Sequence, residues 1–311
     1  MEPITQIGKR IKLRDLQILQ AATQAGSMAK AASELAITQP AVSYAIAEME
    51  HALGVPLLER SSQGVTPTIY GEVMLERSRV IFNELRQGID EIGTLADPSV
   101  GELRIGTTPP MSAIASAVFN RLVASYPRMT FALSVEPTDV LLRALRQRDI
   151  ELVISRLADF VNDDDLDVET LFHDELAVIC NKRNKWARRH GVRLAELVNE
   201  PWVLPTPSGF LTKIIRAAFE DEGLDVPRAT VATQSTYALS VLVANGPFLA
   251  MYPGTMLTTH PQLTPVDVRV PKTRGPIGLI TLKGRSLSPV AKLFVKFAGG
   301  VIKTVRRPGQ T

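Results

Sequence analysis

The sequence predicts an all-α winged helix-turn-helix head, one long helix, and then an α/β domain. Two short segments of helical periodicity, joined by a tight turn, lie between Gly26 and Leu53, and a short β-wing follows up to Gly71. A proline-free stretch runs from Glu72 to Leu95. Beyond Glu102, short apolar strands alternate with helical segments, a pattern typical of sheets that are covered by helices.

The start of each short helix is marked by its capping residues. Ser27 is a favourable N-cap for the first helix, and Ala36-Ile37-Thr38 forms the turn. Thr38 caps the second helix, and Pro40 stands in its first turn, where a missing N–H group costs little. The sequence therefore places the beginning of the second helix at Gln39.

The second helix has two different faces. Its apolar residues recur at helical spacing and are expected to face the core: Val42, Ala45, Ile46, Met49 and Leu53. The opposite face carries Gln39, Ser43 and Ala47, which are small or form hydrogen bonds. Such a face suits the major groove of DNA, where Gln can pair bidentately with adenine. Periodicity alone leaves a part of an ordinary helical bundle as an alternative.

A family resemblance separates these alternatives. It is carried by Leu16, Gly26-Ser27, Ala31-Ala32, Leu35, Thr38 to Ser43, Ile46, Glu50, Leu53-Gly54, Leu57, Arg60, Thr68 and Gly71. This pattern resembles the winged helix-turn-helix of LysR-type transcriptional regulators, and the remaining chain resembles their effector-binding module in length and element order. Three apolar residues depart from the family pattern, and we expect little effect because they conserve volume: Met49, Leu58 and Pro67.

The resemblance implies a bacterial, sequence-specific regulator that binds operator DNA and responds to a small molecule. The residues expected at the DNA are Lys30, Thr38, Gln39, Pro40, Ser43, Tyr44 and Arg60. Tyr44 either helps to select the operator or lies along the sugar-phosphate backbone. Arg60 in the wing is expected to hold a phosphate or enter the minor groove.

Net charge does not identify the DNA-binding part. The chain has a net charge of +3, yet residues 1–71 contain six basic and six acidic residues, so the head is neutral. The placement of the basic residues from Lys9 to Arg14 before the first helix, of Lys30 and of Arg60, doubled in a dimer, must supply the attraction to phosphates. The most basic stretch is Asn181 to His190, which we interpret as a solvated loop and helix face and not as a second DNA site.

The long helix carries an apolar seam. Its steps of four and three residues are those of a coiled coil with two weak positions: Met74, Ser78, Ile81, Leu85, Gly88, Ile92 and Leu95. A helix of this kind needs a covering partner, which is either a second subunit or its own C-terminal domain. The resemblance favours the first, a homodimer or homotetramer joined by linker helices. Pro98 and Gly101 end the helix.

We expect domain limits of 11–71 for the head, 72–96 for the linker and 100–305 for the effector domain. The expected strands in the effector domain are Leu103–Ile105, Phe131–Val135, Glu151–Ile154, Leu176–Cys180, Trp202–Leu204, Thr230–Ala232 and Phe248–Tyr252. The alternation predicts mainly parallel sheets, and the resemblance implies two periplasmic-binding-protein-like subdomains, I (100–155 and 270–305) and II (156–269). The hinge is expected near Ile154–Leu157, the return near Pro265–Val270, and a closing helix at Pro289–Val305.

The expected effector contacts lie in polar loops that immediately precede helices. A helix N-terminus stabilises an anion through its free N–H groups and its dipole, although Ser and Thr are also the ordinary caps of helices. The candidates are Thr107, Thr108, Met111, Ser112, Thr206, Ser208, Phe210, Ser235, Tyr237 and Phe248. Core packing is the stronger interpretation for Phe248. A small carboxylate or a sugar acid would fit these ends.

Several classes of function lack support in the sequence. There is no nucleophile elbow, phosphate loop or His-Glu-x-x-His motif, and the four histidines have no metal-ligand spacing, so we expect no catalytic residue, metal or cofactor. Asp163-Asp164-Asp165 is interpreted as an exposed connector, with a cation site as the alternative. A small-molecule-binding module with secondary DNA binding is the second candidate function.

The cysteine content and the lengths of the apolar stretches indicate where the protein is expected to be located. The single cysteine, Cys180, lies in an apolar run and is expected to be a buried structural thiol. No apolar stretch reaches the ~18 residues of a membrane span, and no signal-peptide core is found, so we expect a cytoplasmic protein. The expected partners are operator DNA, the effector, a second copy of the chain and RNA polymerase.

Overall fold

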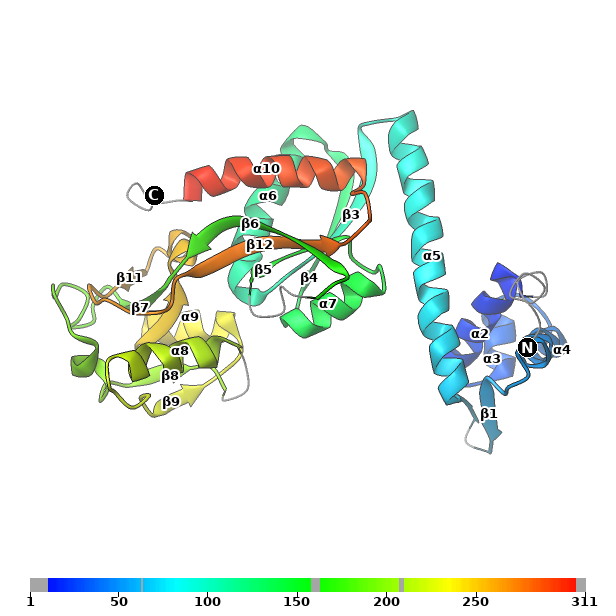
Figure 1. Cartoon of the computed structure of the whole chain (residues 1–311), viewed down its shortest axis with the longest axis horizontal. Helices are drawn as coiled ribbons and strands as arrows, with labels where there is room; N and C mark the ends of the chain where they lie inside the picture. The colour runs from blue at the N-terminus through cyan, green and yellow to red at the C-terminus, as the bar shows by residue number, and fades with distance from the viewer. Residues whose placement is uncertain (1–10, 63, 158–162, 207–209, 306–311) are drawn as a thin grey trace. The chain divides into compact units, whose positions relative to one another are not determined.

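The computed structural model describes residues 11–62, 64–157, 163–206 and 210–305 (Figure 1). It divides into two compact units, which are described here one at a time. The first contains the head and the long helix up to Ile89, together with Gln147–Asp149. The second contains Asp90–Arg146 and the chain from Ile150 onward. Among the described residues, no helix is both long enough and apolar enough to cross a membrane.

The head is a winged helix-turn-helix, as the sequence predicts. Its elements are α2 (Leu13–Ala25), α3 (Met28–Glu34), α4 (Gln39–Leu53), β1 (Leu58–Ser61) and β2 (Gly64–Pro67). The Ser27 hydroxyl accepts a hydrogen bond from the Lys30 N–H at 3.5 Å, and that of Thr38 accepts one from the Ala41 N–H at 3.4 Å. The predicted caps therefore begin α3 and α4. The fully buried core of the head includes Leu19, Ala22, Ala31, Val42 and Ile46.

Backbone contacts hold the wing against the helices. The antiparallel pair β1–β2 runs from Leu58 opposite Pro67 to Ser61 opposite Gly64. At its tip, the Val65 N–H donates to the Gly26 carbonyl at 3.0 Å. Strand β2 is thereby fixed beside the turn that precedes α3.

The long helix α5 (Ile69–Ala96) follows the wing and contains the predicted linker. Its apolar seam has two environments. Near its start, Met74 packs on the head core, and the buried Ser78 hydroxyl accepts a hydrogen bond from the Gln20 side chain at 2.8 Å. Further along, Ile81, Leu85 and Ile92 are 41%, 47% and 69% exposed. The second half of the seam therefore has an apolar surface that the described residues leave open.

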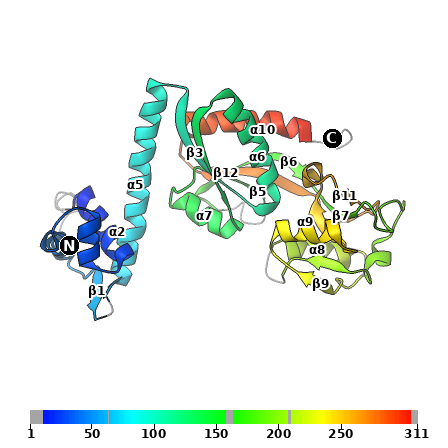
Figure 2. The same cartoon turned by 180° about the vertical axis from the view of Figure 1, so that it is seen from behind.

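Subdomain I of the α/β unit is a five-stranded sheet in the order β4-β3-β5-β12-β6 (Figure 1). Its strands are β3 (Val100–Thr107), β4 (Arg128–Val135), β5 (Leu152–Arg156), β6 (Leu166–Asp174) and β12 (Gly275–Leu282). Helices α6 (Ser112–Ser125) and α10 (Pro289–Val305) cover one face, and α7 (Thr138–Arg146) covers the other (Figure 2). The predicted closing helix is confirmed as α10.

Subdomain II is built on two small sheets with two helices. The first sheet has the order β10-β7-β11, with β7 (Leu176–Asn181), β10 (Ala250–Pro253) and β11 (Leu263–Pro265). The second pairs β8 (Trp202–Leu204) with β9 (Ala229–Ala232). The helices α8 (Phe210–Asp221) and α9 (Thr236–Asn245) pack on two separate apolar clusters. Cys180 is completely buried in β7, and burial raises the pKa of its thiol to about 11, as expected for a structural cysteine.

Two expectations for this unit are wrong. The predicted hinge at Ile154–Leu157 is displaced, because β6 pairs with β12 within the first sheet and the chain crosses to subdomain II only between Asp174 and Leu176. The sheets are mixed and not mainly parallel, since β12 runs antiparallel to both β5 and β6. The acidic run Asp163–Asp165 precedes β6 at the surface, as expected of a connector between strands. Asp163 and Asp165 each pair with Arg146 at 2.7 Å, and β6 begins at Leu166.

The two crossings between the subdomains are tied together by buried polar groups. The Arg156 side chain, at the end of β5, donates to the Thr273 carbonyl, and the Leu176 N–H donates to the Thr273 hydroxyl at 3.3 Å. The Thr255 hydroxyl donates to the Asp174 carboxylate at 2.6 Å. Burial raises the pKa of Asp174 and lowers that of Arg156. These contacts fix the observed arrangement of the two subdomains.

Candidate DNA interface and effector-binding residues

The face of α4 opposite the core is open to solvent. Gln39 and Pro40 are exposed, Ser43 is half-buried, and Tyr44 is 68% exposed. The Gln39 amide donates to the Ser43 hydroxyl at 2.9 Å, a contact between positions i and i+4. Meanwhile Val42, Ile46 and Met49 are at most 1% exposed. The polar residues predicted for DNA are therefore free of the core, and the hydrogen bond holds two of them side by side.

The two basic residues predicted to contact DNA phosphates, Lys30 and Arg60, lie before and after α4 in the sequence. Lys30 is exposed in α3, and Arg60 is exposed on β1 of the wing. The hydroxyl of Thr38 is occupied by its capping bond to Ala41, so this residue has a structural task besides any contact with DNA. Lys30 and Arg60 thus come from separate elements of the same small head.

The first predicted effector loop separates into open and buried residues. The hydroxyl of Thr107, which is fully buried, donates to the Ile154 carbonyl at 3.0 Å, and Met111 is 2% exposed within the subdomain I core. Both side chains are buried by contacts within subdomain I, and their contact with an effector stays a prediction. Thr108 is half-buried, and the Ser112 hydroxyl donates to the Pro109 carbonyl at 2.8 Å, beside the start of α6.

The second predicted effector loop is joined to a third segment of the chain. The Gln234 amide donates to the Thr206 hydroxyl, which links the end of β8 to the start of α9. Ser235 is exposed and caps α9 by accepting from the Ala238 N–H at 3.1 Å. Tyr237 is 80% exposed, whereas Phe248 is half-buried against the α9 cluster. Ser208 and the Phe210 side chain lie outside the described residues.

Gln234, part of the polar start of α9 together with Ser235, and Tyr252 extend this region. Gln234 brings two polar helix ends together through Thr206, and its role depends on a contact that local sequence does not show. Tyr252 is 2% exposed, and its hydroxyl has no hydrogen-bond partner among the described residues. Burial raises the pKa of Tyr252 to about 12. It belongs to an apolar cluster that Ala113 of α6 also contacts, so the start of α6 lies against subdomain II.

Comparisons with known families cover both units. The family described as "Bacterial regulatory helix-turn-helix protein, lysR family" matches residues 13–72, and the "LysR substrate binding domain" matches residues 96–302. The chain belongs to the LysR family. It is a LysR-type DNA-binding transcriptional regulator with an effector-binding domain.

Relatives and solved structures agree with this assignment. The LysR-type regulator is 30% identical to the regulator TdcA of Escherichia coli K12 over 79% of its own length and 78% of that protein. It is 29% identical to GbpR of Azospirillum brasilense over 91% of its own length and 84% of that protein. Full-length CbnR in complex with its target DNA has the same fold, with a TM-score of 0.70 at 21% identity over 93% of this chain and 99% of CbnR. A full-length variant of OxyR from Pseudomonas aeruginosa has a TM-score of 0.64 at 19% identity over 96% and 97% of the two chains.

Among the described residues, no group of three or more His, Cys, Asp or Glu side chains is arranged to hold a metal ion. The acidic residues Asp163 and Asp165, the one cluster that the sequence suggests, are paired with Arg146 instead.

Proposed function

We propose that this LysR-type regulator reads operator DNA with the polar face of α4 and holds the phosphates with Lys30 and Arg60. The observation that carries the proposal is the division of α4, on which Gln39 and Ser43 lie outside while Val42, Ile46 and Met49 fill the core. Thr38 and Pro40 begin the helix at this face, and Tyr44 extends it. A helix with such a face docks into the major groove through its N-terminal residues.

A band-shift titration with salt tests this function against a module that binds small molecules and uses DNA only secondarily. Phosphate contacts release counterions, so operator affinity should fall linearly with salt on logarithmic scales. A module whose DNA binding is incidental would show no preference for one duplex over a scrambled duplex of equal length. Equal affinity for both duplexes at every salt concentration would overturn the proposal.

We propose further that the effector is a small carboxylate or sugar acid held by the ends of helices in the two subdomains. The supporting residues are Thr108, Ser112, Thr206, Ser235 and Tyr237, with Ser208 and Phe210 retained from the sequence. Thr108 precedes α6, Ser112 begins it, and Ser235 is the N-cap of α9, so these residues lie at the positive ends of two helix dipoles, which favour an anion. Phe248 remains a candidate apolar wall of this site.

Transcription assays with and without the inducer test this site. Thr108→Val and Ser235→Ala should blunt the response to the inducer while operator affinity stays unchanged. A normal response in both variants would remove these residues from the site. The control is Ser125→Ala, at the far end of α6 from Ser112.

The remaining proposals concern assembly and location. We propose that exposed apolar residues of α5 join two copies, that the bound regulator contacts RNA polymerase, and that it acts in the cytoplasm without catalysing a reaction. Membership of a regulator family supports these proposals. Domain limits of 11–71, 72–96 and 100–305 remain our proposal for designing shorter fragments.

A further inference from the structure

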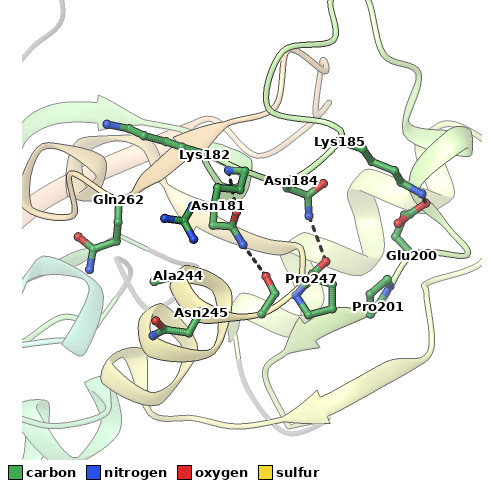
Figure 3. A pocket seen from close by; sticks show the side chains of 12 residues that line it. Asn181, Lys182, Asn184, Lys185, Glu200, Pro201, Ala244, Asn245, Pro247 and Gln262 are labelled. Atoms are coloured by element: carbon green, nitrogen blue, oxygen red, sulfur yellow. Dashed lines mark hydrogen bonds and ion pairs between the residues drawn. The ribbon is translucent and has the colours of Figure 1, made fainter.

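We propose that subdomain II has a second binding site, for a small organic anion, in a recess beside the turn that follows β7. The recess has a volume of about 870 Å³, which is within the range of small-molecule sites. Residues from four separate segments surround it: the turn from Asn181 to Lys185, Glu200 and Pro201, the end of α9 from Ala244 to Pro247, and Gln262 (Figure 3).

The recess is a different place from the proposed effector site. Helix α9 has ten residues and is therefore about 15 Å long. Ser235 caps its first turn, whereas Asn245 and Gly246 line the recess at its last. A ligand in the recess would consequently contact the opposite end of α9 from one at Ser235.

The floor and frame of the recess are held by side-chain amides. Asn181 donates to the Gly246 carbonyl at 2.6 Å, and Asn184 donates to the Pro247 carbonyl at 3.1 Å (Figure 3). The Asn245 amide donates to the Val241 carbonyl at 2.9 Å. These bonds occupy carbonyl oxygens near the end of α9, where a helix would otherwise repel an anion. The frame is therefore both fixed and less negative than a bare helix C-terminus.

The positive charges of the recess are only partly compensated. Lys185 is paired with Glu200 at 2.6 Å. Lys182 and Arg183 are exposed, and within the part of the chain that the structure describes their side chains have no hydrogen bond or ion pair. The lining therefore keeps two cations available, and Arg can bind a carboxylate through two parallel hydrogen bonds.

The rest of the lining selects an organic ligand over a bare ion. Pro201, Ala244 and Pro247 provide apolar surface for a hydrocarbon or aromatic body, and Gln262 adds an amide at the rim. Apolar walls with a few polar groups that fix orientation are the usual composition of a small-molecule site. A ligand with carboxylates next to a flat apolar body would match both the two cations and the apolar walls of the recess.

Calorimetric titration of the full chain with phthalate, an aromatic dicarboxylate, tests the site at constant ionic strength. We expect saturable binding, and an apparent Kd at least about tenfold weaker for the Lys182→Ala/Arg183→Ala variant and for the neutral analogue phthalamide. The matched control is Lys213→Ala/Arg216→Ala, which removes the same charge from exposed positions of α8 in the same subdomain. The control should bind phthalate within about twofold of the parent chain. Circular dichroism verifies that each variant is folded.

Three results would overturn the proposal. The first is that neither phthalate nor citrate, a second small carboxylate, gives saturable binding to the parent chain. The second is an equal loss of affinity in the two double variants, which would show only a general effect of charge. Unchanged binding by Lys182→Ala/Arg183→Ala would place the ligand elsewhere. Operator affinity and the effects of Thr108→Val are measured separately, so failure here is distinguishable from failure of the proposed function.

Discussion

Glu50 shows how a single side chain connects α4 to the wing. Its carboxylate accepts hydrogen bonds from the backbone N–H groups of Leu57 and Leu58, at 2.8 and 3.1 Å. One residue near the end of α4 therefore fixes the beginning of the wing. Hydrogen bonds to a charged group are stronger than neutral ones, and loss of the carboxylate leaves both donors unsatisfied.

Glu50→Ala should lower the free energy of unfolding by about 2 kcal/mol, because the N–H groups of two buried residues lose their acceptor. Urea denaturation measures the change. Glu48→Ala, on the exposed side of the same helix, should stay within about 0.5 kcal/mol of the parent chain. Equal effects in the two variants would show that Glu50 does not hold the wing.

At the level of residues, the sequence predicts the exposed and buried faces of α4, but not the contacts of the predicted effector residues within the fold. Caps and periodicity are local, so the sequence correctly places Thr38 as the N-cap of α4 and Gln39 and Ser43 within the helix. The task of the Thr107 hydroxyl depends on Ile154, which lies on a neighbouring strand. A pattern within one segment does not contain that contact, so the sequence does not show that the Thr107 hydroxyl has a partner within the fold.

Among the elements, the junction of the wing with α5 depends on a glycine. A Cβ atom on Gly71, in the first turn of α5, would lie 2.0 Å from the Leu57 carbonyl oxygen. The Leu57 carbonyl oxygen belongs to the backbone, so it cannot move aside without displacing the wing. Gly93 belongs to the same helix, but a Cβ atom there would meet nothing within 4 Å.

Gly71→Ala should therefore destabilise the chain by about 2 kcal/mol or more, as overpacking against fixed atoms does. Gly93→Ala should raise stability by up to about 1 kcal/mol, since Ala is the better helix former. Thermal unfolding of the two variants compares them directly. Destabilisation of similar size in both would contradict the close approach at Gly71.

The exposed half of α5 supports the proposed dimer. Ile81, Leu85, Ile89 and Ile92 lie at steps of four, four and three, and each is at least 41% exposed. An apolar stripe of this length is normally covered by another helix. Leu85→Lys/Ile92→Lys should convert the dimer to a monomer in sedimentation experiments. Glu76→Lys, an exposed control on the same helix, should leave the dimer intact, and a dimeric Leu85→Lys/Ile92→Lys chain would contradict the assignment.

There is a physical reason why strand β12 was not predicted from the sequence. Strand β12 contains Gly275, Pro276 and Gly278, residues that are depleted in strands. Its pairing with β6 shifts register between Ile277 and Gly278, and a Cβ atom on Gly278 would lie 2.6 Å from the Glu169 carbonyl oxygen. Glycine is required at this irregularity by contact with another strand. The crossing between subdomains was consequently predicted too early.

On the scale of the whole molecule, a neutral head must bind a polyanion through the placement of its charges. Residues 1–71 have equal numbers of basic and acidic residues, and the structure separates Lys30 on α3 from Arg60 on the wing. Two copies would present this pair twice. Affinity from phosphate contacts and specificity from base contacts should therefore respond to different substitutions.

The most direct test of the account compares Gln39→Ala with Lys30→Ala on an operator duplex, selected from a random pool, and on all of its single-base variants. Gln39→Ala should cost about 1–3 kcal/mol and relax the preference at one base position, whereas Lys30→Ala should weaken binding to every duplex alike. Base preferences that stay unchanged in Gln39→Ala, with losses equal to those of Lys30→Ala on every duplex, would contradict the claim that the polar face of α4 reads DNA.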